Sequence, residues 1–203
     1  MPLKDLLWAC PACHGIEALG TDGRCRACGS VYRRGRGARI VRLADGGREE
    51  RTALEWLGAL PWPDLDGEGT ALPGGLQPPF EAAVQVREAG VEQPVRRAGA
   101  FLGFIERFGP PSGGRLHLDF EALRFTAQSG SGEWAWQLGD MTAVQPASST
   151  IQLKARGRAV ISVRFTEGSV RLWEQRLKYC IRHAFRTHGR AAIREFQPRI
   201  RPA

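Results

Sequence analysis

Four cysteines near the N-terminus are the residues best suited to chemistry. They form two C-x-x-C pairs, Cys10 with Cys13 and Cys25 with Cys28, and eleven residues separate the pairs. Each pair is a tight turn that presents two sulfur atoms, and a hairpin between the turns brings the pairs together. Four thiolates suit a tetrahedral ion. The spacing therefore predicts one structural Zn²⁺ that is closed to water and not catalytic.

The stretch around these cysteines resembles a zinc ribbon over about residues 6–43. Gly15 and Gly29 follow the two cysteine turns, where the backbone needs the freedom of glycine. The apolar shell is expected to consist of Leu7, Trp8, Tyr32, Ile40 and Val41. A core of that size does not fold alone, so the resemblance implies that the metal stabilises the domain. The alternative is a redox-active dithiol, but the thioredoxin-like βαβ pattern that it needs is missing.

The chain is strongly basic, with 29 lysine and arginine residues, 21 acidic residues and a formal net charge of +8. Arginine supplies 26 of these cations, a bias typical of a GC-rich bacterial genome. The charge is uneven. Residues 1–46 hold 8 basic and 4 acidic groups, residues 47–95 hold 3 and 9, and residues 96–203 hold 18 and 8. These shifts predict domain boundaries.

Motifs of common enzyme classes are missing from the sequence. It contains no G-x-x-x-x-G-K-[ST] phosphate loop, no G-x-S-x-G nucleophile elbow and no H-x-x-x-x-D motif of acyltransferases. The four histidines are scattered along the chain. We therefore expect a binding protein and not an enzyme.

The longest apolar stretch, residues 98–105, is far shorter than the roughly 20 residues that cross a bilayer. The N-terminus lacks the apolar core and the cleavage site of a signal peptide. The metal-type cysteine spacing also fits a reducing compartment. We expect a cytoplasmic protein with peripheral contact at the inner face of the membrane.

Composition divides the chain into a ribbon at 1–46, a short helix with an acidic linker at 47–94, a folded domain at 95–189 and a basic tail at 190–203. The helix is predicted within residues 47–60, where Leu54 and Leu57 lie at helical spacing with Trp56 beside them. The linker is predicted from five prolines and four glycines among residues 61–79.

The third segment changes to a period of two, which is typical of strands. Seven short strands are expected, at 98–107, 115–120, 123–125, 134–138, 141–145, 150–155 and 159–165. Turn-forming clusters such as GPPSGG and QSGSG separate several of them. Close antiparallel spacing of this kind predicts a small barrel or sandwich. The fold class is therefore mainly β.

One amphipathic helix closes this segment, with Ser169 as its N-cap and Gly189 after its end. Val170, Trp173, Leu177, Cys180, Ile181 and Ala184 form its apolar stripe. Seven strands followed by one helix that bears a tryptophan resemble the pleckstrin-homology (PH) fold, and the short pattern is similar to its GRAM-type members. The resemblance covers about residues 95–188 and implies a barrel capped by the helix. Trp134, Trp136 and Trp173 keep the strand and helix periods, so they are predicted as core.

This resemblance implies a docking module for anionic lipid headgroups or for a membrane-associated protein. The contacts would come from basic loops, and the candidates are Arg107, Arg115, Lys154, Arg156 and Arg158. A turn with three cations and no acid can hold a phosphate through charge-assisted hydrogen bonds. A solvated hairpin tip is the equally open alternative.

Two further functions stay open. One is a scaffold or regulatory module of a lipid-metabolism enzyme, because a ribbon beside a PH-like domain suits protein docking. The other is nucleic-acid binding through the ribbon arginines Arg33, Arg34, Arg36, Arg39 and Arg42. No aromatic stacking set is interleaved with these arginines, which favours a solvated ribbon edge instead.

Overall fold

The computed structural model describes residues 3–37, 39–44, 47–60, 77–130, 132–147 and 149–188. The chain forms two compact units: residues 1–77 with 168–176, and residues 78–167 with 177–203. Each unit contains its own antiparallel sheet. No helix among the described residues combines the length and the apolar character that crossing a membrane requires.

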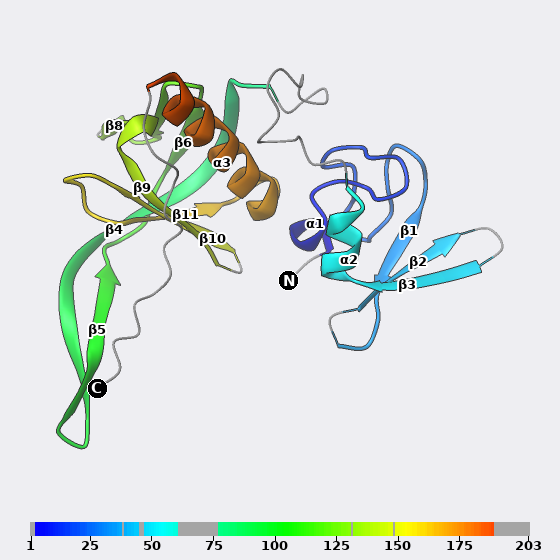
Figure 1. The fold of residues 1–203 in the computed structure, drawn as a ribbon, viewed down its shortest axis with the longest axis horizontal. Coiled ribbons are helices and arrows are strands. Elements are labelled where there is room, and N and C mark those ends of the chain that lie inside the picture. Colours follow the sequence, from blue (N-terminus) through cyan, green and yellow to red (C-terminus); the bar gives the residue numbers. More distant parts are fainter. Residues whose placement is uncertain are drawn as a thin grey trace. The chain divides into compact units, whose positions relative to one another are not determined.

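The first unit surrounds the cysteines with short elements. They are α1 (Leu3–Leu6), β1 (Val31–Arg34), β2 (Arg39–Ala44), β3 (Gly47–Thr52) and α2 (Ala53–Gly58). The strands form a three-stranded sheet in the order β1-β2-β3 (Figure 1). All five predicted shell residues are buried. The prediction of a small apolar shell is therefore confirmed.

Residues 47–60 differ from the single helix that the leucine spacing predicts. Residues 47–52 form β3, which pairs with β2 along its full length. The helix begins only after Thr52, whose side chain and that of Glu55 form a capping box. The predicted apolar side is wrong at Leu54, which is 79% exposed, whereas Leu57 packs against the core and Trp56 is buried.

The second unit is a curled antiparallel sheet and the C-terminal part of the helix that follows it. The elements of this part of the chain are β4 (Phe80–Arg97), β5 (Ala100–Phe108), β6 (Ser112–Leu118), β7 (Ala122–Ala127), β8 (Glu133–Gln137), the 3-10 helix η1 (Leu138–Asp140), β9 (Met141–Pro146), β10 (Thr150–Ala155), β11 (Ile161–Phe165) and α3 (Val170–Thr187), whose residues 170–176 group with the first unit. The strand order is β8-β7-β6-β4-β11-β10-β9, and β5 pairs with β4 outside this path. The two end strands of the path are not hydrogen-bonded to each other within the described chain, so the sheet is a half-barrel. This confirms the mainly β prediction.

Strand β4 lies largely inside the segment that composition assigns to a linker. Its first half follows a period of two, with Phe80, Ala82, Val84 and Val86 buried. This half pairs with β6 on one side and β11 on the other. The second half of β4 pairs with β5 and forms a long hairpin arm beyond the curled sheet (Figure 1). The folded region therefore begins near residue 80, ahead of the predicted boundary at 95.

Alternating strands and the C-terminal part of α3 supply the core of the half-barrel. Leu116, Leu118, Leu123, Ile151 and Leu153 are at most 1% exposed. Trp136 and Trp173 are buried, and Trp134 is half-buried with its ring stacked on Phe125 at a centroid distance of 5.6 Å. The core role predicted for these tryptophans thus fits their burial. The predicted basic tail at 190–203 and most of the linker, residues 61–76, lie outside the described residues.

Candidate metal centre

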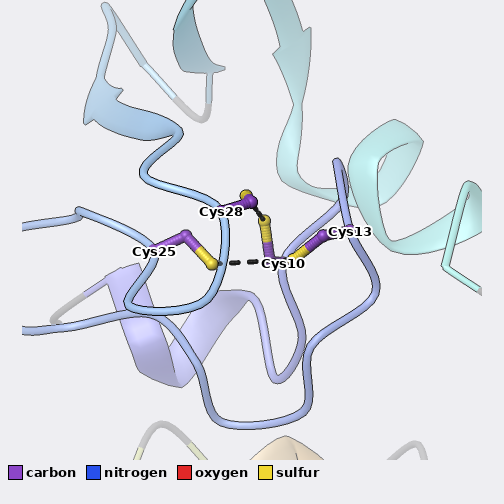
Figure 2. Close-up of side chains that lie close together, drawn as sticks. All are labelled: Cys10, Cys13, Cys25 and Cys28. Atoms are coloured by element: carbon purple, nitrogen blue, oxygen red, sulfur yellow. Dashed lines mark hydrogen bonds between the residues drawn. The ribbon is translucent and has the colours of Figure 1, made fainter.

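The four cysteines predicted as ligands come together in the first unit. Their sulfur atoms all lie within 4.8 Å of one another (Figure 2). Cys10 Sγ is 3.7 Å from Cys28 Sγ, and Cys13 Sγ is 3.7 Å from Cys25 Sγ. A tetrahedral zinc ion with Zn–S bonds of about 2.3 Å separates its sulfur ligands by about 3.8 Å. The cluster therefore fits a metal ion such as zinc.

Two equivalent backbone turns hold the cysteine pairs. In the first, the His14 N–H donates to the Cys10 carbonyl at 2.7 Å and the Cys10 N–H donates to the Gly15 carbonyl at 2.9 Å. In the second, the Gly29 N–H donates to the Cys25 carbonyl at 2.9 Å and the Cys25 N–H to the Ser30 carbonyl at 2.8 Å. The repeated geometry explains why each pair presents both sulfurs to one point.

Positive φ angles occur at equivalent places in the two turns. They are found at His14, with φ of 60°, and at Gly29, with φ of 75°. The sequence predicts Gly15 for this role in the first turn, and that is wrong by one residue. His14 occupies the position because the turn demands this conformation directly after the second cysteine, and it accepts the strain that glycine avoids.

Burial divides the ligand set into two classes. Cys10 and Cys25, the first cysteine of each pair, are buried, whereas Cys13 and Cys28 are exposed. None of the four forms a disulfide. The centre therefore sits at the surface of the unit, anchored by two sulfurs that belong to its apolar core.

Tyr32 is a contact that the sequence does not assign to the centre. Its hydroxyl lies 3.6 Å from Cys10 Sγ, and its side chain is fully buried. Its ring meets the Trp56 ring edge-on at 5.8 Å, and the Trp56 indole N–H donates to the Ile40 carbonyl at 3.0 Å. Hydrogen bonds to ligand atoms fix their orientation and tune a metal site. The sequence offers one hint of this role: Tyr32 is the second residue of β1, the strand that follows the second cysteine pair.

The protein alone gives three of the thiols different proton affinities. The Ser30 hydroxyl and backbone N–H lower the pKa of Cys28 to about 6. For Cys13, the Gly15 backbone N–H lowers the pKa, but burial and the neighbouring thiols raise it further, to about 12. Burial likewise raises the pKa of Cys25. A cation that binds all four sulfurs must therefore displace protons that the empty cluster holds near neutral pH.

Four of the five basic residues predicted for anion binding lie at one end of the half-barrel, and the fifth, Arg115, lies elsewhere. Lys154 is the penultimate residue of β10, and Arg156 and Arg158 lie in the tight β10–β11 turn, where Gly157 has a φ of 68°. Arg107 lies near the end of β5, at the base of the hairpin arm. All four are exposed.

Backbone contacts bring these four residues to the same end of the sheet. The Ala89 N–H donates to the Val160 carbonyl at 2.7 Å, next to the turn. Ala89 is also the partner of Phe108, which follows Arg107. Arg107 and the β10–β11 turn thus both lie close to Ala89 of β4.

Arg115 is separate from this group. It pairs with Ala83 of β4, six residues before Ala89, which corresponds to about 20 Å along the strand. Its guanidinium also lies 3.3 Å from the Glu81 carboxylate. The structure therefore does not bring Arg115 to the other four predicted residues.

Comparisons with known proteins do not show a family for the chain. No protein-family model matches it, and no curated protein matches it. A solved structure with similarity to the chain is the C-terminal domain of an unknown protein from Leishmania infantum. The two are 12% identical with a TM-score of 0.30, and the match covers 47% of this chain and 82% of the other. A likeness this weak carries no functional argument.

Proposed function

We propose that the chain is a non-enzymatic docking module that carries a structural zinc ion and binds the anionic headgroups of a membrane surface. The observation that carries the proposal is the gathering of Arg107, Lys154, Arg156 and Arg158 at one end of the half-barrel. Each cation near an anionic surface contributes about 1 kcal/mol to binding.

Zinc is the metal we infer for the cysteine cluster. The sulfur separations of 3.7 Å suit tetrahedral coordination, and a set of four thiolates leaves no position for water or substrate. Because the ion would be fully coordinated by protein, its role would be to stabilise the ribbon. A structural role agrees with a docking module and requires no chemistry at the metal.

We infer further that the half-barrel is PH-like. The strand order supports this. The first strand of the half-barrel, β4, lies between β6 and β11, and β11 is the last strand in the sequence. A single helix, α3, follows the last strand. The GRAM-type resemblance of the sequence agrees with this order.

The tip of the hairpin arm supports a membrane as the anionic partner. Arg96 pairs with Phe101, and Arg97 pairs with Ala100, across a turn in which Ala98 and Gly99 have positive φ angles. Phe101 is 48% exposed. An exposed aromatic side chain beside two arginines suits the interface between headgroups and acyl chains.

Vesicle flotation tests the proposal. The full chain is mixed with neutral phosphatidylcholine vesicles or with vesicles that also contain phosphatidylglycerol. Replacing Arg156 and Arg158 by Gln should weaken binding to the anionic vesicles roughly thirtyfold, because about 2 kcal/mol is lost. Binding should also fall as salt is raised.

A matched variant controls for net charge. Arg33→Gln with Arg36→Gln removes two exposed cations from the ribbon and should leave flotation unchanged. Equal losses in both double variants, or binding that does not depend on anionic lipid, would contradict the proposal. A parallel gel-shift assay with DNA and RNA decides the nucleic-acid alternative, which requires the ribbon variant to lose binding instead.

A further inference from the structure

A hollow of about 220 Å³ lies on the outer face of the half-barrel. Residues of β4, β10 and β11 line it, together with Phe108 at the end of β5. The alternation of the strands explains its character. Val84, Val86 and Val163 are buried on the core side, which places the intervening residues of β4 and β11 on the opposite face.

Strand register brings two arginines together in this hollow. Ser162 is the partner of Arg87, and Arg164 is the partner of Gln85, on neighbouring antiparallel strands. Arg87 and Arg164 are therefore diagonal neighbours, with backbones roughly 7–8 Å apart. Both side chains line the hollow, so their guanidinium groups are within reach of one small anion.

No described residue of the lining balances the charge of the hollow. None of the described residues that line it is acidic. Within the described part of the chain, neither Arg87 nor Arg164 makes a side-chain hydrogen bond or ion pair, whereas Arg115 and Arg124 on the same sheet pair with Glu81 and Asp119. Two like charges at this spacing repel each other. An anion between the two arginines attracts both of them and outweighs this repulsion.

Neutral hydrogen-bond donors complete the lining. Ser162 and Thr150 are half-buried, and Gln85 and Ser149 stand at the rim. The planar guanidinium group presents paired N–H donors that match the oxygen atoms of a phosphate, and hydroxyl groups serve the remaining oxygens. The lining therefore offers charge and hydrogen bonds to a single tetrahedral dianion.

We propose that this hollow binds the phosphate group of a small phosphomonoester through Arg87 and Arg164. Its volume is below the 300–1,000 Å³ of typical drug-sized sites, which limits the ligand to a phosphate with a short organic group. The source is either a soluble metabolite or a lipid headgroup with a terminal phosphate. The site uses none of the residues assigned to membrane docking, so it stands whether or not that proposal holds.

Calorimetry on the full chain tests the soluble source, with inorganic phosphate and glycerol 3-phosphate as probes. Arg87→Gln and Arg164→Gln should each weaken binding about tenfold or more, because each removes charge-assisted hydrogen bonds. The ribbon variant Arg33→Gln with Arg36→Gln removes as much charge as the two hollow substitutions together and should bind as the wild type does. Far-ultraviolet circular dichroism checks that all variants remain folded.

Flotation with vesicles of phosphatidic acid in phosphatidylcholine tests the lipid source, since this lipid carries a terminal phosphomonoester. If the soluble probes bind and the hollow variants lose them, the ligand is a free phosphomonoester. If only the vesicles bind and the hollow variants lose them, the ligand is a headgroup. The proposal is overturned if neither probe binds, or if the ribbon variant loses as much binding as the hollow variants.

Discussion

The ribbon and the half-barrel bury very different amounts of apolar surface. The cluster at the centre of the ribbon unit consists of eight buried residues, and two of these are the metal-site cysteines Cys10 and Cys25. The half-barrel core draws on alternating side chains of its strands and on the C-terminal part of α3. Because hydrophobic stabilisation scales with buried apolar area, we expect the half-barrel to fold without a ligand and the ribbon to depend on a metal.

The largest expected effect comes from breaking the metal centre. Cys25→Ser should remove the zinc and unfold the ribbon while the half-barrel stays folded, because structural zinc contributes about 10–16 kcal/mol in small domains. Elemental analysis should show one zinc per wild-type chain and none in the variant. Hydrogen exchange should show lost protection in β1–β3 and unchanged protection in β6 and β7.

Cys180→Ala is the matched control for this experiment. Cys180 is buried in α3 and is not part of the cysteine cluster, so its removal should leave the zinc content at one per chain. A Cys25→Ser protein that keeps its zinc and its ribbon protection would show that the two units do not differ in this way.

The next largest effect should come from a substitution in the core of the half-barrel. Leu116→Ala truncates a fully buried side chain of β6, and such changes cost about 2–5 kcal/mol. Urea denaturation should report the loss, while zinc content stays at one per chain. The same change at Leu54, which is 79% exposed, should be nearly neutral. Equal losses at the two positions would refute the assignment of the core.

The sequence predicted the features of both regions that depend on residues close together in the chain. The four cysteines lie within a short stretch, so spacing alone predicted that they cluster. Strands β6 to β11 alternate strongly, so their periods identified them. The contact of Tyr32 with Cys10 was missed because it depends on how β1 packs against the first cysteine turn, which no spacing records. The positive φ of His14 was missed because the neighbouring Gly15 is the residue type that usually takes this conformation.

Charge composition misled the boundaries for a physical reason. The acidic segment after residue 46 was separated from the basic ribbon, but Arg42 of β2 faces Glu49 of β3 at 3.7 Å. Opposite charges on adjacent strands stabilise their pairing, so a sign change along the sequence marked a strand pair and not a domain boundary. The alternation of β4 was readable, but the acidic, proline-rich context suggested a linker.

A smaller effect should follow from the close packing of β6 and β7. A Cβ atom at Gly114 would lie 2.2 Å from the Thr126 carbonyl oxygen and 2.7 Å from the Phe125 ring. Gly114→Ala should therefore cost about 1–3 kcal/mol by overpacking, measured by urea denaturation. At Gly47 in β3 no atom lies within 4 Å of an added Cβ, so Gly47→Ala should be close to neutral. If the two substitutions cost the same, the half-barrel is not the more tightly packed region.

The smallest expected effect concerns the β6–β7 turn and its pH dependence. Asp119 Oδ1 accepts from the N–H groups of Glu121 and Ala122, both at 2.8 Å, and its Oδ2 pairs with Arg124. Partial burial raises the pKa of Asp119, but these donors together lower it below its ordinary value of 3.8. A lowered folded-state pKa means that the carboxylate contributes stability at pH values above about 4, and that this contribution is lost as the pH falls through the folded pKa.

Asp119→Asn should therefore cost about 1 kcal/mol at pH 7 and progressively less below pH 4, measured by urea denaturation across this range. Glu121→Gln, at an exposed neighbour, should change stability little at either pH, and a pH-independent difference between Asp119→Asn and the wild type would rule out the carboxylate as the cause.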